Sequence, residues 1–137
     1  MTIPLIDKSS YLRGLLVLAK KDNIVSESEK KIILDAGKRL GFSSDFCEEI
    51  LFTILDNECI CDEPVEFRNQ TVAKSFISDG IKLSLSGKQI TEEELDWLRK
   101  SAEVNKISHR WFDKQVSNSE YMVSNTPLAQ LTLYSII

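Results

Sequence analysis

The sequence is poor in the two residues that interrupt helices, with 3 prolines and 5 glycines among 137 residues. Such sparse punctuation favours a few long helices over many short strands. It also lacks any apolar run close to the ~20 residues that a membrane-spanning helix needs. No charged start followed by a long apolar stretch marks a signal peptide. We therefore expect a cytoplasmic protein without membrane insertion.

Residues that carry chemistry are also scarce. The chain has one histidine, His109, and three cysteines, Cys47, Cys59 and Cys61. An odd number of cysteines is typical of reduced thiols in the cytosol, and the Cys59–Cys61 spacing is not by itself that of a metal site. No serine or cysteine is placed by a motif to use His109 as its base. We predict that the chain is not an enzyme.

Positive charge is missing from the middle of the chain. The net charge is −4 and the pI is near 5.1, and no Lys or Arg occurs between Leu40 and Phe67. Because contacts with phosphates dominate nucleic-acid affinity, this balance makes a nucleic-acid partner a poor expectation. The same stretch carries acidic residues that form either a solvated surface or a docking patch for a protein partner. These are Asp45, Glu48, Glu49, Asp56, Glu58, Asp62, Glu63 and Glu66.

Helical periodicity is the main positive signal. Apolar residues recur at helical spacing in six segments, so we expect an all-α protein, a compact bundle of about six main helices. The expected segments start near Ser9 or Ser10, at Ser26, at Ser43, between Val65 and Gln70, at Thr91 and at Ser108. The pattern ends near Asn118. Residues 118–137 are a C-terminal tail that can form a helix, an extended segment or a self-association surface.

The two halves of the chain resemble each other at an offset of 65 residues, the separation of Glu29 and Glu94. Ser26 with Glu29, and Thr91 with Glu94, both have the spacing of a capping box. Core residues and the next cap follow in the same order in each half, so equivalent positions have the same physical role. We therefore predict two pseudo-symmetric repeats, over about residues 8–57 and 70–117.

Residues 15–29, with the sequence LLVLAKKDNIVSESE, resemble the repeat signature of TerB-like domains, a family named for a tellurite-resistance protein. The resemblance covers about residues 8–117, within an expected domain of residues 1–117. It implies an all-helical fold with internal pseudo-symmetry and a cation site at acidic positions. It also implies a non-enzymatic binding or scaffold role, associated with bacterial stress response or membrane-linked systems.

The acidic positions of that signature are Asp22 and Glu29, with Asn23 in place of a glycine. Ca²⁺ or Mg²⁺ prefers oxygen ligands from a loop and a helix start, so these two carboxylates are candidate metal ligands. Backbone carbonyls, water or Glu27 would have to complete the shell. The alternative is structural: Glu29 closes a capping box and Asp22 ends a helix. In the second half Glu94 alone matches, which puts a second cation site in doubt.

A divalent-cation-responsive module at Asp22 and Glu29 is therefore the first alternative to a protein-binding module. The second alternative is DNA binding through a helix-turn-helix over residues 91–117, where Trp111 and Phe112 are similar to the recognition helix of homeodomains. Acidic residues in the same segment largely cancel its positive charge, which weakens this hypothesis. We expect a monomer or a weak homodimer, with a protein partner of unknown identity.

Overall fold

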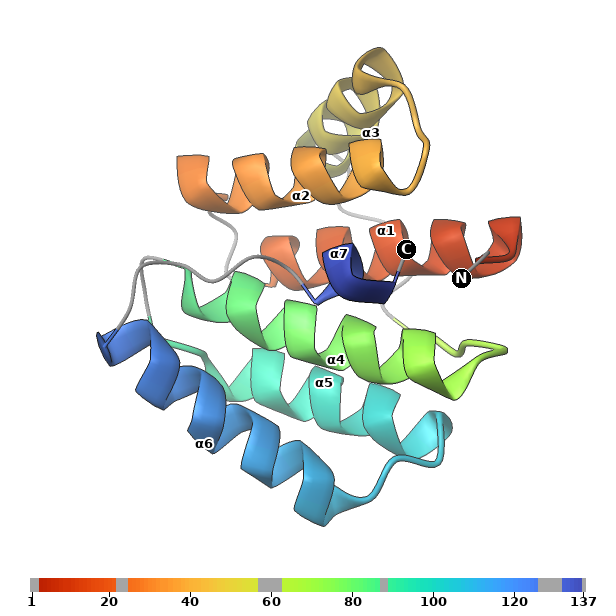
Figure 1. The fold of residues 1–137 in the computed structure, drawn as a ribbon. Helices are drawn as coiled ribbons and strands as arrows, with labels where there is room; N and C mark the ends of the chain where they lie inside the picture. Colours follow the sequence, from red (N-terminus) through yellow and green to blue (C-terminus); the bar gives the residue numbers. More distant parts are fainter. Residues whose placement is uncertain (1–2, 22–24, 57–62, 87–88, 126–131, 137) are drawn as a thin grey trace.

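The computed structural model describes residues 3–21, 25–56, 63–86, 89–125 and 132–136, and within these ranges it contains helices and no strand (Figure 1). The all-α prediction is confirmed. The six main helices are α1 (Leu5–Lys20), α2 (Glu27–Arg39), α3 (Ser44–Asp56), α4 (Gln70–Leu85), α5 (Glu92–Val104) and α6 (His109–Asn125). A one-turn helix, α7 (Leu133–Ile136), follows near the C-terminus.

Helices α1 and α4 form the centre of the bundle. They lie side by side, and α4 also contacts α5, α6 and α7 (Figure 1). Leu15, Phe76 and Ile77 are fully buried between these helices and their neighbours, and each such side chain contributes roughly 1.5–3 kcal/mol through burial. Gly80 permits the close approach of α4, because a Cβ there would lie 2.7 Å from Leu98 Cδ2.

The helix bounds follow the same offset of 65 residues as the sequence. Moved by this offset, α1 and α2 coincide with α4 and α5, and the start of α3 coincides with the start of α6. Both expected capping boxes are formed. Gly41 and Lys106, which the offset also relates, are the described residues with positive φ, at 100° and 60°. The local structure therefore agrees at equivalent positions, while the pseudo-symmetry of the two halves in space stays a prediction.

The bounds differ from the expected ones at both ends. Helix α1 starts at Leu5 rather than near Ser9, and Leu5 and Ile6 are 70% and 55% exposed. Their exposure explains why the first turn gave no periodic signal. Helix α6 continues to Asn125, so the first part of the predicted C-terminal tail, residues 118–125, is helical, which is one of the forms expected for the tail. The tail ends in α7, where Leu133 is fully buried.

Two polar side chains fix the segment that leads into α4. The Asn105 amide accepts from the Phe67 backbone N–H at 2.7 Å and donates to the Val65 carbonyl at 2.8 Å. The buried carboxylate of Asp7 accepts from the Arg68 N–H, with 3.2 Å to each oxygen. Buried polar groups are stable only when they are hydrogen-bonded in this way. These contacts connect residues 63–69 to α1 and to the end of α5.

Candidate functional site

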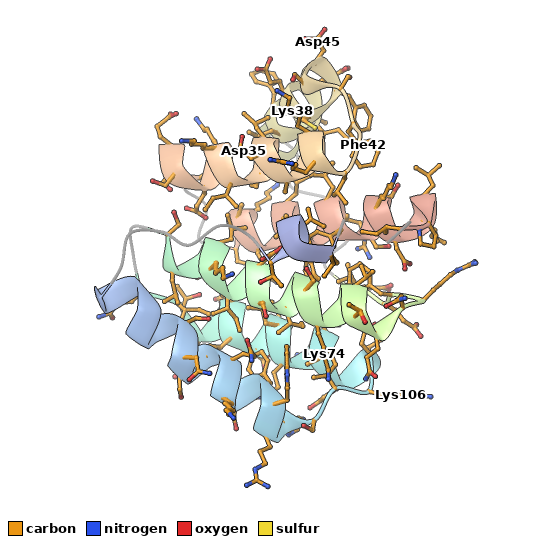
Figure 2. The ribbon with its side chains drawn as sticks, viewed as in Figure 1. Asp35, Lys38, Phe42, Asp45, Lys74 and Lys106 are labelled. Carbon is orange, nitrogen blue, oxygen red and sulfur yellow. The ribbon has the colours of Figure 1, made fainter. Side chains whose placement is uncertain are left out.

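An apolar pocket of about 210 Å³ lies between α1 and α3. Its lining comes from α1, from α3 and from the turn between α2 and α3: Ser9, Leu12, Arg13, Leu16, Phe42, Phe46 and Ile50. Phe46 remains 42% exposed. Its ring packs against Phe42, with 5.4 Å between the ring centroids. Figure 2 shows Phe42 at the α2–α3 turn and Asp45 on the side of α3 that points away from the bundle.

At the corresponding place in the second half, α4 and α6 are in direct contact. The ammonium of Lys74, labelled on α4 in Figure 2, lies 5.4 Å from the centroid of the Trp111 ring. One turn further on, the Ser78 hydroxyl donates to Gln115 Oε1 at 3.2 Å. Phe112, next to Trp111 on α6, is fully buried. Helix α6 is therefore seated on α4 by apolar and polar contacts together.

The offset of 65 residues places different side chains at the equivalent positions of the first half. In the first half, Ser9 occupies the position equivalent to Lys74, and Phe46 the position equivalent to Trp111. Cys47 occupies the position equivalent to Phe112. A serine is too short to cover the ring across the pocket, and a thiol occupies far less volume than a phenyl ring. The substitutions explain why α3 packs mainly on α2 and leaves a pocket against α1.

The acidic residues predicted as a partner surface fall into separate groups. Asp45, Glu48 and Glu49 are exposed on α3. Helical spacing puts them on one face with Phe52, which is 69% exposed. Asp56 ends α3, and Glu58 and Asp62 lie outside the described residues.

Glu63 and Glu66 are exposed in the segment before α4, not on α3. Glu63 lines a second, polar hollow of about 380 Å³ together with Glu93 and Asp96 of α5 and with Lys21 and Lys100. Two lysines and three carboxylates therefore share this hollow. The unbroken negative charge of the α3 face is not repeated there.

The candidate metal ligand Glu29 is a capping residue in the structure. Its Oε1 accepts from the Ser26 N–H at 3.2 Å, and its own N–H donates to Ser26 Oγ at 3.1 Å. Glu94 and Thr91 repeat the arrangement, with 3.1 Å for both contacts. Asp22 lies outside the described residues, and no group of three or more His, Cys, Asp or Glu side chains in the described part is arranged to hold a metal. The cation site at Asp22 and Glu29 therefore stays a prediction, and it would need further oxygen ligands to complete the shell.

A buried polar network, which the sequence analysis did not single out, anchors the C-terminus. Asp79 of α4 is fully buried and accepts from the N–H groups of Thr132 at 2.6 Å and Leu133 at 3.0 Å. The Tyr11 hydroxyl donates to the same carboxylate and lies 2.8 Å from Ser75 Oγ. Burial raises the pKa of Asp79, and burial followed by the charge of Asp79 raises the pKa of Tyr11.

The network therefore holds α7 against α4, and the Leu133 side chain is fully buried. The sequence signal for this network is an acidic residue, Asp79, that lies between Ile77 and Ile81 in an otherwise largely apolar helical segment. A charge in such a place is costly unless hydrogen bonds satisfy it.

The helix pair α5–α6 carries charges that are paired with each other. Lys100 lies 3.0 Å from Asp96, and Arg99 lies 3.6 Å from Asp113. Arg99 and Lys100 therefore each face a carboxylate, which reduces the positive charge that this segment could offer to DNA phosphates. DNA binding through residues 91–117 has no further support from the geometry.

Comparisons of the chain with protein-family models, with curated proteins and with solved structures found no match. The resemblance to TerB-like domains therefore stays a prediction. Within the part of the chain that the structure describes, no helix combines the length and the apolar character needed to cross a membrane.

Proposed function

We propose that this chain is a non-enzymatic protein-binding module of TerB-like type, whose binding face joins the α1–α3 pocket to the acidic side of α3. The observation that carries the proposal is the pocket itself, with the half-exposed ring of Phe46 in its wall. Partly exposed aromatic side chains beside a concave apolar surface are typical anchors of protein interfaces. Phe52 adds a second exposed ring on the same helix.

The carboxylates of Asp45, Glu48 and Glu49 provide the polar part of this face. Exposed charges of one sign increase the association rate with a partner of opposite sign, and they disfavour acidic competitors. They contribute little to the stability of the fold, because solvent screens them. Binding and folding therefore depend on different residues of α3, which makes the two separable by mutation.

The first test places a photo-reactive phenylalanine analogue at position 46 and, as a matched control, at position 104. Val104 is also 42% exposed but lies at the end of α5. We expect a discrete cross-linked partner from position 46 in the native host and none from position 104. Equal cross-linking from the two positions would mean that the pocket is not the binding face.

The second test reverses charge at Glu48 and Glu49 by substitution with lysine. Both side chains are exposed, so the melting temperature should stay within the range of ordinary surface substitutions. Capture of the partner found by cross-linking should be lost. Capture that continues unchanged would remove the acidic side of α3 from the proposed binding face.

A further inference from the structure

The second half of the molecule shows what covers an aromatic ring at the position of Phe46. There, Lys74 of α4 places its ammonium 5.4 Å from the centroid of Trp111, a distance at which the ring attracts the cation. In the first half α1 supplies Ser9 instead of a lysine, and Phe46 is left 42% exposed at the pocket. The first half thus keeps an aromatic ring at this position of the helix pair but has no lysine at the α1 position equivalent to Lys74.

The charges around Phe46 also favour a cation. Asp45 precedes it, Glu49 follows one helical turn later, and both are exposed. No Lys or Arg occurs in residues 41–66, so α3 has no positive charge of its own. Arg13 lies on the opposite wall, where it already has an interaction partner within the chain. The α3 wall of the pocket is therefore both aromatic and negatively charged.

The size of the pocket limits what enters it. A cavity of about 150 Å³ is known to hold one benzene molecule, and this pocket measures about 210 Å³. It has room for one large apolar side chain, such as Phe or Leu. It has no room for a whole helix between α1 and α3, so a partner helix would lie across the opening and insert one anchor.

We infer that the pocket takes one large apolar side chain from an amphipathic helical segment of a partner protein, and that a lysine or arginine of that segment covers Phe46 and faces Asp45 and Glu49. The inference rests on the proposed function and specifies the chemistry of the partner. In such complexes one apolar face supplies the anchor and the flanking residues supply selectivity. Here the selectivity is for positive charge.

Three synthetic helical peptides test the inference with the full chain. They share one apolar face with a single Phe anchor and differ in their flanking residues, which are all Lys, all Gln or all Glu. Fluorescence anisotropy should give the order Lys, then Gln, then Glu from tightest to weakest, with at least about a tenfold difference in Kd between the first and the last. The difference should shrink at high salt, because exposed charges are screened.

Two variants separate the anchor from the cation. Ile50→Lys fills the pocket with a charged side chain and should abolish binding of all three peptides. Phe46→Leu keeps an apolar wall without a ring, and it should bring the affinity of the Lys peptide close to that of the Gln peptide. Val104→Ala, at an equally exposed apolar residue at the end of α5 and away from the pocket, is the control and should change neither. Melting temperatures confirm that the variants fold.

The outcomes distinguish the inference from the proposed function. Tightest binding of the Glu peptide, or equal binding of all three with Ile50→Lys still abolishing it, would overturn the basic partner and retain the pocket as a binding site. No binding by any peptide, together with no cross-linked partner from position 46, would overturn both. If Phe46→Leu loses the preference for the Lys peptide over the Gln peptide and the control variant keeps it, the result supports the inference directly.

Discussion

Helices α3 and α6 occupy equivalent places in the two halves, yet they are packed differently. Helix α6 lies mainly on α4, whereas α3 lies mainly on α2 and projects away from α1 (Figure 1). Both helices begin after a serine that caps them, with Ser43 Oγ accepting from Phe46 N–H at 3.1 Å and Ser108 Oγ from Trp111 N–H at 3.2 Å. The same local signals thus start both helices. The volume of the inward-facing side chains decides whether each helix packs closely on the central helix of its half, α1 or α4.

The largest effect should come from the inward residues of these two helices. Phe112 on α6 is fully buried, and its equivalent on α3 is Cys47, whose Sγ lies against Gly37. We expect Phe112→Ala to lower the free energy of unfolding by about 4 kcal/mol and Cys47→Ala to lower it by about 1 kcal/mol, because far less surface is removed. Urea unfolding measures both. Equal losses would mean that α3 is seated as firmly as α6.

The next effect concerns the C-terminal anchor. Asp79 on α4 accepts hydrogen bonds from the C-terminal segment, whereas the equivalent position on α1 is Gly14, which has no side chain to accept one. Asp79→Ala leaves the N–H groups of Thr132 and Leu133 without their acceptors and should cost about 3 kcal/mol. Relative to the wild type, Asp79→Ala should increase the hydrogen-exchange rate of α7 amides more than that of α5 amides. Unchanged exchange in α7 would contradict the anchoring role.

The direction of the pKa shift of Asp79 predicts how this residue's contribution to the free energy of unfolding depends on pH. Burial raises the pKa of Asp79, with Tyr11 of α1 and Lys82 of α4 as its polar and charged neighbours. The folded chain therefore keeps a proton on Asp79 over a pH range in which the unfolded chain has lost it, so this group's contribution to stability falls as pH rises through that range.

Asp79→Asn removes this titration. The stability of the wild type relative to Asp79→Asn should increase as pH falls from neutrality toward ~4, the ordinary pKa of an aspartate. Parallel urea unfolding of the two proteins measures this difference. A difference that stays constant with pH would mean that the pKa of Asp79 is the same in the folded and unfolded chains.

A smaller and equal effect is expected at the two capping boxes. Ser26→Ala and Thr91→Ala should each cost about 1 kcal/mol, because Glu29 and Glu94 make the same pair of hydrogen bonds in the two halves. Thermal unfolding with excess Ca²⁺ or Mg²⁺ and with EDTA tests the cation hypothesis at Asp22 and Glu29. A metal-dependent rise in Tm that Glu29→Gln loses and Glu94→Gln keeps would replace the cap by a cation site.

The caps and the helix order were predictable because they depend on short-range patterns. Ser26 and Glu29 are three residues apart and form their contacts within one turn. The pocket and the C-terminal anchor were not predictable, because both depend on which helix faces which. Phe46 has the same periodicity whether α1 covers it or not, and Asp79 receives its donors from residues more than 50 positions away in the sequence.

The smallest effect is expected from exchanging Ser9 and Lys74, the residues that distinguish the α1–α3 contact from the α4–α6 contact. Ser9→Lys places a lysine beside Phe46, where it repeats the arrangement of Lys74 over Trp111. An exposed cation–π contact of this kind should raise the free energy of unfolding by about 0.5 kcal/mol, and Lys74→Ser should lower it by about as much. Because the new lysine occupies the place that the inferred partner's cation would take, Ser9→Lys should also weaken the Lys peptide more than the Gln peptide. Stabilisation without this change in preference would show that the cation position and the peptide site are distinct.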